Sequence, residues 1–166
     1  MNKHLNDLVT LELGDVRNLS MFKDNEFDIV TMSFGIRNVP EKEIALCEIY
    51  RVLEKKKNRK EKSGVGKLAI LEFSEPGEGS GALGFVARLF IHYVVPIVGA
   101  VLSGSPREYL HLQNSIQEFP SPSQFKQLME ATRCGKNKKG TFHVEKIIPM
   151  NFDSVHIYVA VPVENR

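Results

Sequence analysis

Four polar residues follow apolar, strand-like segments and are of types that could act together. Asp15 comes soon after LVTLEL, Ser33 and Arg37 stand at and just beyond the end of FDIVTMSF, and Glu72 is near the end of GKLAILEFSE. If the three segments are parallel strands of an open α/β sheet, these side chains fall along one edge, outside the carboxyl ends of the strands, where such sheets bind ligands. We therefore expect a polar site at that edge.

Two of these residues have simpler explanations. Asp15 lies in the triplet Gly14-Asp15-Val16, where the carboxylate could accept a hydrogen bond from an adenine amino group while the Val16 N–H donates to a ring nitrogen. A Gly-Asp pair after a strand is, however, usually only a turn. Arg37 could form an ion pair with Glu41 or Glu72, and the sequence alone favours that interpretation over a catalytic role.

Composition indicates one globular domain over residues 1–166. The chain has 42% apolar and 25% charged residues and a net charge of +2, which gives no reason to expect nucleic acid as the partner. We interpret the basic stretch within 54–66, and residues 135–140, as solvated loop insertions. The two cysteines, Cys47 and Cys134, and the absence of a signal-like segment predict a reducing compartment and no disulfide framework.

Hydrophobic periodicity predicts an α/β fold in which strands alternate with helices. The run at 27–34 is almost continuously apolar and predicts a central parallel strand covered on both faces. A helix from 41 to 53 should bury one apolar face, Ser121 and its neighbours mark a new helix start, and the last two strands can form a hairpin. The predicted strands are 8–13, 27–34, 66–75, 141–150 and 154–163, and the predicted helices are 41–53, 82–97, 104–119 and 123–132.

The apolar stretch 82–102 is long enough to span a bilayer. Arg88, His92 and Pro96 within it argue against a spanning helix. We expect instead a helix that packs on the sheet, covers a lipophilic ligand or touches a membrane, and its hydrophobicity does not separate these alternatives.

A series of short motifs resembles one enzyme family. SFGIRNV at 33–39, RVL at 51–53, LEFS at 71–74 and EYLHLQNSIQEFPS at 108–121 are similar to the ubiquinone/menaquinone biosynthesis C-methyltransferases of the UbiE type. The resemblance extends from about residue 8 to about residue 134 and is weaker in the last two strands.

The resemblance implies a class I, Rossmann-like methyltransferase fold and S-adenosylmethionine (SAM) as cofactor. It implies that Asp15 and Val16 contact adenine, that Ser33 contacts the cofactor and that Tyr109 contacts the substrate. It also places Arg37 and Asn38 in the catalytic site. The reaction it implies is methylation of a ring carbon of a polyprenylated hydroquinone.

Ring methylation requires a stabiliser for phenolate oxygen and an acceptor for the ring proton. Arg37 suits the first role, but its pKa is too high for it to serve as a base. A water held by Arg37 and Asn38, or the carboxylate of Glu72, is the better acceptor.

The chain departs from the family pattern in its cofactor motifs. The sequence has no GxGxxG-type turn and lacks the acidic residue that ends the family's second strand. It looks like the C-terminal half to two-thirds of the enzyme, a partial fold without the first two strands. Segment 8–13 would then pair directly with 27–34, or a second chain would fill the gap by swapping or complementation, or the sequence is a truncated gene model or splice form.

The sequence therefore supports two functions. The first is a SAM-dependent C-methyltransferase, or a truncated form of one, acting on a polyprenyl benzoquinol in ubiquinone biosynthesis. The alternative is a non-catalytic scaffold or dimerisation module of a quinone-biosynthesis complex. The resemblance and the lysine-rich insertions imply the matrix side of the mitochondrial inner membrane, peripheral membrane contact, and a homodimer or larger complex.

Overall fold

The computed structural model describes residues 8–55, 65–74, 106–151 and 153–164, with the backbone alone described at 106–110 and 113. The predicted helix at 82–97 and the loop at 76–81 lie outside these ranges. The elements, in chain order, are β1 (Ile29–Ser33), the 3-10 helix η1 (Ile36–Asn38), α1 (Lys42–Val52), β2 (Lys67–Phe73), α4 (Pro106–Gln117), α5 (Pro122–Ala131), β3 (Gly140–Met150) and β4 (Val155–Glu164).

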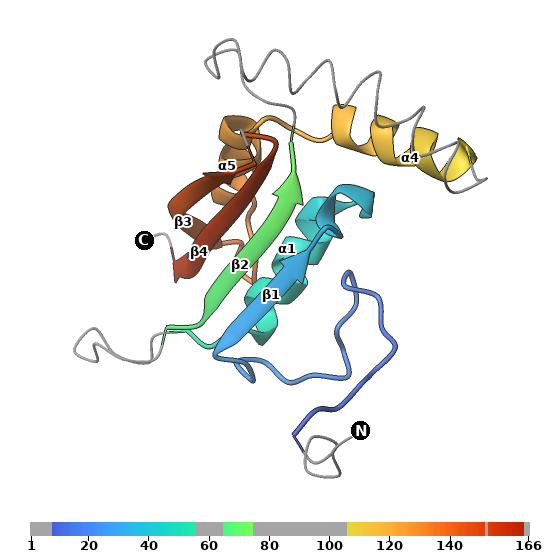
Figure 1. Cartoon of the computed structure of the whole chain (residues 1–166). Helices are drawn as coiled ribbons and strands as arrows, with labels where there is room; N and C mark the ends of the chain where they lie inside the picture. The colour runs from blue at the N-terminus through green and yellow to red at the C-terminus, as the bar shows by residue number, and fades with distance from the viewer. Residues whose placement is uncertain (1–7, 56–64, 75–105, 152, 165–166) are drawn as a thin grey trace.

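The described strands form one mixed sheet in the order β1-β2-β4-β3 (Figure 1). β1 and β2 are parallel, with Ile29 opposite Lys67 and Ser33 opposite Leu71. β4 is antiparallel to both β2 and β3, so the predicted C-terminal hairpin is confirmed. The parallel pair brings the ends of β1 and β2 to the same edge of the sheet, as the sequence predicted.

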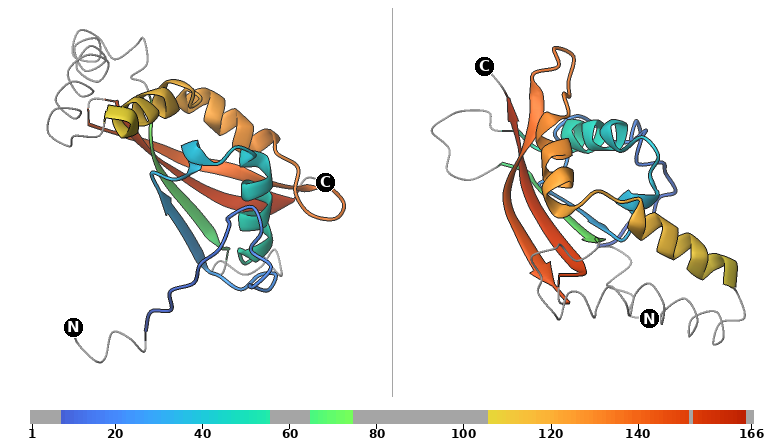
Figure 2. Two further views of the ribbon diagram at one scale, coloured as in Figure 1. Left: turned by 90° about the vertical axis from the view of Figure 1, so that its right-hand side faces the viewer. Right: turned by 90° about the horizontal axis from the view of Figure 1, so that it is seen from above.

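Helices α1 and α5 lie on one face of this sheet (Figures 1 and 2). Alternate β2 residues, Leu68 and Ile70, are fully buried against them, with Phe125 of α5 and Tyr158 of β4 in edge-to-face contact in the same core. Apolar side chains recur at every second residue in β2 and about every 3.6 residues in the helices, so each element directs one apolar face into this core.

Two expectations about β1 and its predecessor are wrong. Segment 8–13 forms no strand, and Leu8, Leu11 and Leu13 are 82%, 90% and 99% exposed. β1 is not covered on both faces: it is an edge strand of the described sheet, and its residues alternate between exposed and half-buried. The two differences share a cause, because a strand needs a hydrogen-bonded neighbour and the described chain supplies none beyond β1.

The helix predictions that fall on described residues are confirmed with small differences. Ser121 caps α5 as expected: its hydroxyl accepts from the Gln124 N–H and the Gln124 side chain accepts from the Ser121 N–H. The apolar face expected in α1 consists of residues 44, 45, 49, 52 and 53. All of these are buried except Ile44, which is half-exposed, and Leu46 is buried as well. No helix of the described part is long and apolar enough to cross a membrane.

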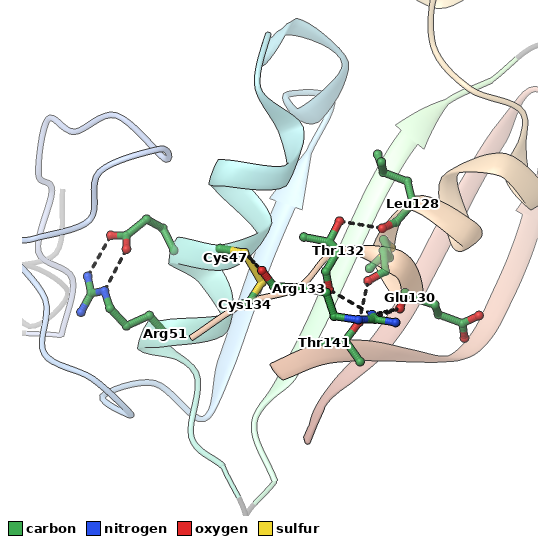
Figure 3. The surroundings of a disulfide bond; sticks show 10 residues. Cys47, Arg51, Leu128, Glu130, Thr132, Arg133, Cys134 and Thr141 are labelled. Carbon is green, nitrogen blue, oxygen red and sulfur yellow. Dashed lines mark hydrogen bonds and ion pairs between the residues drawn. A yellow bond between two sulfur atoms is a disulfide. The ribbon is translucent and has the colours of Figure 1, made fainter. Parts of the chain in front are cut away.

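The expected absence of a disulfide is also wrong. Cys47 of α1 and Cys134, between α5 and β3, are joined by a disulfide, and no described cysteine is free (Figure 3). The two residues are 87 positions apart in the sequence. They meet because α1 and the end of α5 pack side by side on the sheet, which composition and spacing do not reveal.

The chain before β1 is held against α1 by a group of charged contacts. The Arg51 guanidinium donates to the carbonyl oxygens of Leu19 and Phe22 at 2.8 and 2.9 Å, and Glu48 accepts from the Leu19 N–H at 2.8 Å. Glu48 and Arg51 also pair with each other, which lowers the pKa of the Glu48 carboxyl and raises that of Arg51. These contacts fix the loop that carries Asp15.

Candidate active site at the ends of the parallel strands

A buried ion pair lies where β1 and β2 end. The Arg37 Nη1 atom is 2.6 Å from Glu72 Oε1, and the two side chains are 9% and 0% exposed. The Arg37 backbone N–H donates to the other carboxylate oxygen at 3.1 Å, and the Phe73 N–H donates to Oε1 at 2.9 Å. Glu72 therefore uses both oxygens to hold η1 against the end of β2.

Further contacts fix the plane of the guanidinium. Arg37 Nη1 also donates to the Phe34 carbonyl oxygen at 2.7 Å, and Nε donates to the Ser115 hydroxyl of α4 at 3.3 Å. The guanidinium carbon lies 5.4 Å from the centre of the Phe73 ring, in a cation–π arrangement. Among the described residues, no group accepts a hydrogen bond from Nη2. As far as the described residues go, two N–H donors of a cation held by Glu72, Phe34 and Ser115 thus remain for a ligand.

Arg37 contributes to the wall of a cavity of about 470 Å³ between η1 and α4. Lys42 stands on the η1 side and donates to the Val39 carbonyl oxygen at 2.9 Å. Donors and acceptors converge on this space from two elements, which is typical of a site for a polar ligand. The lining residues are Arg37, Asn38, Val39, Pro40, Lys42, His111, Asn114, Ser115 and Glu118.

Asp15 lies in a turn in the loop before β1. Its carboxylate accepts from the Arg17 side chain at 2.7 Å and from the Arg17 N–H at 2.9 Å, and Arg17 also pairs with Glu41. These hydrogen bonds lower the pKa of Asp15 to about 2, so that the carboxylate is ionised at neutral pH. The Asp15 side chain is about half-exposed, and in the described part no group accepts a hydrogen bond from the Val16 N–H. The Val16 N–H is a donor without an acceptor among the described residues, whereas both Asp15 oxygens already accept from Arg17 and would have to share or exchange that contact to bind adenine.

A second buried polar group lies two residues beyond Glu72. The Ser74 hydroxyl is 2.7 Å from Nδ1 of His156, whose Nε2 is 2.9 Å from the Asp153 carboxylate. Ser74 and His156 are almost fully buried, and the Ser74 N–H donates to the Ser154 carbonyl oxygen at 3.1 Å. These hydrogen bonds connect the end of β2 to the turn before β4. It was not identified from the sequence, because its members are 82 residues apart.

The structure brings together part of the predicted site. Arg37 and Glu72 are in contact, and Asn38 lines the same cavity. Ser33 ends β1 and is exposed, while no hydrogen bond joins Asp15 or Ser33 to the Arg37–Glu72 pair. Tyr109 lies in α4, with its side chain outside the described atoms.

Sequence reasoning missed Ser115 and Lys42, which hold the guanidinium and the η1 backbone. Ser115 bonds to Arg37 Nε, and Lys42 bonds to carbonyl oxygens of η1 and Val39. The Ser-Ile pair at 115–116 belongs to the family resemblance and was the available signal. No cluster of three or more metal-ligating side chains occurs in the described ranges.

Comparison with known proteins defines the class. The mixed sheet, the helices on one of its faces and a match to a methyltransferase family model identify the class as a methyltransferase with an α/β fold. The matching model is described as the ubiE/COQ5 methyltransferase family and covers residues 7–143. The chain belongs to that family.

Curated relatives are similar over most of this chain. A demethylmenaquinone methyltransferase of Staphylococcus haemolyticus is 39% identical over 84% of the chain and 53% of its own length. A ubiquinone/menaquinone biosynthesis C-methyltransferase UbiE of Bradyrhizobium is 37% identical over 79% of the chain and 47% of its own length. A mitochondrial 2-methoxy-6-polyprenyl-1,4-benzoquinol methylase of Bos taurus is 39% identical over 71% of the chain and 32% of its own length.

The chain spans between about a third and a half of the length of these relatives. Among solved structures, a SAM-dependent methyltransferase of Thermotoga maritima, described as a possible histamine N-methyltransferase, aligns with a TM-score of 0.48 and 17% identity. That alignment covers 89% of this chain and 61% of the other.

Proposed function

We propose that this chain acts in SAM-dependent C-methylation of a polyprenyl benzoquinol in ubiquinone biosynthesis. The observation that carries the proposal is how the Arg37 guanidinium is held and which of its donors have no acceptor among the described residues. Its guanidinium is held by Glu72, Phe34 and Ser115, borders a cavity, and keeps the two N–H groups of Nη2 without an acceptor in the described residues. A fixed cation with spare donors is what a developing phenolate oxygen requires.

Each residue of the site has a proposed role. Arg37 donates from Nη2 to the quinol oxygen and favours its ionised phenolate form, in which the ring carbon that is methylated is more nucleophilic than in the neutral phenol. Asn38, beside Arg37, orients a water molecule that accepts the ring proton. Glu72 has both oxygens occupied by Arg37 and Phe73, so positioning Arg37 is a better role for it than accepting the proton. Tyr109 lies on α4, the helix that borders the cavity from the other side.

The cofactor would be held at the same edge of the sheet. When bound, SAM supplies an electrophilic methyl group. The Asp15 carboxylate accepts from the adenine amino group, the Val16 N–H donates to a ring nitrogen, and Ser33 offers a hydroxyl at the end of β1. The Val16 N–H, which has no acceptor in the described part of the chain, and the half-exposed, ionised Asp15, once it exchanges its contact with Arg17, fit this role. The sequence given has no GxGxxG-type turn to hold the methionine part.

The proposed setting follows from the relatives. The Bos taurus relative is named a mitochondrial benzoquinol methylase, and we extend that location and substrate to this chain. A polyprenyl substrate partitions into membranes, so the proposed partners are the inner-membrane surface on the matrix side and a homodimer or quinone-biosynthesis complex.

A methyl-transfer assay tests the proposal. The purified chain is incubated with SAM labelled in its methyl group and a short-tailed 2-methoxy-6-polyprenyl-1,4-benzoquinol. We expect label in the quinol ring and a loss of at least about tenfold in turnover for Arg37→Lys, which lacks the planar set of donors.

Lys67→Met, at an exposed site on β2, is the matched control and should keep wild-type turnover. Full turnover by Arg37→Lys would contradict the role of Arg37. Absence of label with a folded chain would contradict catalysis by this chain and favour the scaffold alternative.

A further inference from the structure

The proposed reaction needs a side chain that finally takes up the ring proton. A water molecule beside Asn38 can carry that proton, but water alone is a weak base at neutral pH. A side-chain base must therefore stand behind the water, on the wall of the cavity that Arg37 borders. Its basic atom must also be unoccupied by structural contacts.

His111 is the residue of the described cavity wall that suits this role. Arginine and lysine side chains carry their protons at neutral pH, and serine and asparagine side chains are not bases. Glu118, also on the wall, offers a carboxylate, which is a weaker base than imidazole. Histidine is the side chain that most often accepts a proton in catalysis.

Helix α4 and the residue after it place a polar row on one face, at spacings of three and four residues. The row lines the cavity and consists of His111, Asn114, Ser115 and Glu118. Ser115 attaches this face to the site, because its hydroxyl accepts from Arg37 Nε at 3.3 Å. Positions four apart on a helix have Cβ atoms about 6 Å from each other. His111 therefore lies one helical turn from the residue that contacts the guanidinium.

The imidazole of His111 differs in its surroundings from those of the other described histidines. His143 Nδ1 is 3.6 Å from Glu130 Oε1, and both ring nitrogens of His156 have hydrogen-bond partners. His111 is exposed, and no hydrogen bond or ion pair within the described ranges involves its ring. An exposed and unoccupied imidazole can accept a proton from the cavity and release it to solvent.

We propose that His111 is the base that finally accepts the ring proton, a role that rests on the proposed methyltransferase function. Once the ring carbon has taken the methyl group, and the sulfur has kept the electron pair of the broken bond, the ring C–H bond breaks. Its electron pair restores the aromatic ring. The proton passes to the water beside Asn38, which gives one of its own protons to a nitrogen of His111. The imidazolium then loses this proton to solvent.

Turnover of ring-deuterated and ordinary short-tailed 2-methoxy-6-polyprenyl-1,4-benzoquinol with methyl-labelled SAM tests this role. His111→Ala should lower kcat by about a hundredfold and leave KM nearly unchanged, because acid–base catalysis contributes about 10²–10⁴-fold. Deuterium at the methylated carbon should slow the variant more than the wild type, since proton removal then limits the rate. Imidazole added to the solution should restore part of the turnover of His111→Ala.

His143→Ala is the matched control, because His143 has a 62% exposed side chain outside the cavity, and it should keep the wild-type kcat and isotope effect. Full turnover by His111→Ala would overturn the role of His111 alone, since methyl transfer by the wild type would still stand. A loss that imidazole does not relieve and deuterium does not increase would do the same. A comparable loss in Glu118→Gln but not in His111→Ala would assign the role to the carboxylate. A folded wild-type chain that transfers no label would overturn the proposed function and this role with it.

Discussion

Arg37 and Glu72 illustrate how a buried charge can be kept ready for a ligand. Removing two charges from water costs several kcal/mol each, and the pair offsets this through direct contact and through hydrogen bonds to Phe34, Phe73 and Ser115. The sequence interpretations of Arg37 as an ion-pair partner and as a catalytic group are compatible, because no residue in the described ranges accepts a hydrogen bond from Nη2. The ion pair positions the group that we propose to be catalytic.

At this scale we predict strong coupling between the two residues. Arg37→Met leaves a buried carboxylate without its cation and should lower the free energy of unfolding by about 3 kcal/mol. In the double variant, Glu72→Gln should recover part of the stability lost in Arg37→Met. Urea denaturation of the two single variants and the double variant should therefore give a coupling energy above about 1 kcal/mol.

The exposed pair of Lys67 and Glu145, with a nitrogen–oxygen distance of 3.9 Å, provides the control cycle. Lys67→Met and Glu145→Gln should each change stability by less than about 0.5 kcal/mol and should not couple measurably. Equal coupling energies for the two pairs would contradict the prediction that a buried ion pair couples more strongly than an exposed one.

At the scale of elements, local patterns predicted most of the fold. The amphipathic helix at α1, the capping box that begins α5 and the alternation in β2 are all encoded by residues close in sequence, and they are found where expected. Segment 8–13 has an equally clear strand pattern but no neighbour in the described chain. The Ser115 contact and the Cys47–Cys134 bond depend on how distant elements pack, which periodicity does not report.

The disulfide gives a prediction about how α1 is held to the α5–β3 connection. It closes a loop of 87 residues, and a link of that span should stabilise the fold by about 2 to 4 kcal/mol through restriction of the unfolded chain. Reduction with dithiothreitol should therefore lower the urea midpoint of the wild type.

Cys134→Ser should match the reduced wild type approximately and should not respond to dithiothreitol. Cys47→Ser, at a less buried position, serves as the second variant, because it breaks the same bond with less disturbance of the core. An unchanged wild-type midpoint after complete reduction would contradict this prediction.

At the scale of the whole molecule, the described sheet ends at a strand whose outer edge is open. In the site that we propose, the substrate side, with Arg37, Asn38 and the cavity, lies within the described residues, and the cofactor side is represented there by Asp15, Val16 and Ser33. The sequence has no GxGxxG-type turn that could complete the cofactor side. Whether the chain can bind the cofactor is therefore the most informative question about it.

Calorimetric titration of the purified chain with S-adenosylhomocysteine answers that question directly. We predict one site per chain, with weaker binding in Asp15→Ala and unchanged binding in Glu12→Ala. Because Arg17 lowers the pKa of Asp15 to about 2 from its usual 3.8, the carboxylate stays ionised below that usual value, and its contribution to affinity should be constant from pH 8 down to about pH 3.5. A folded chain that shows no binding at millimolar ligand would contradict the account of a methyltransferase site at this edge of the sheet.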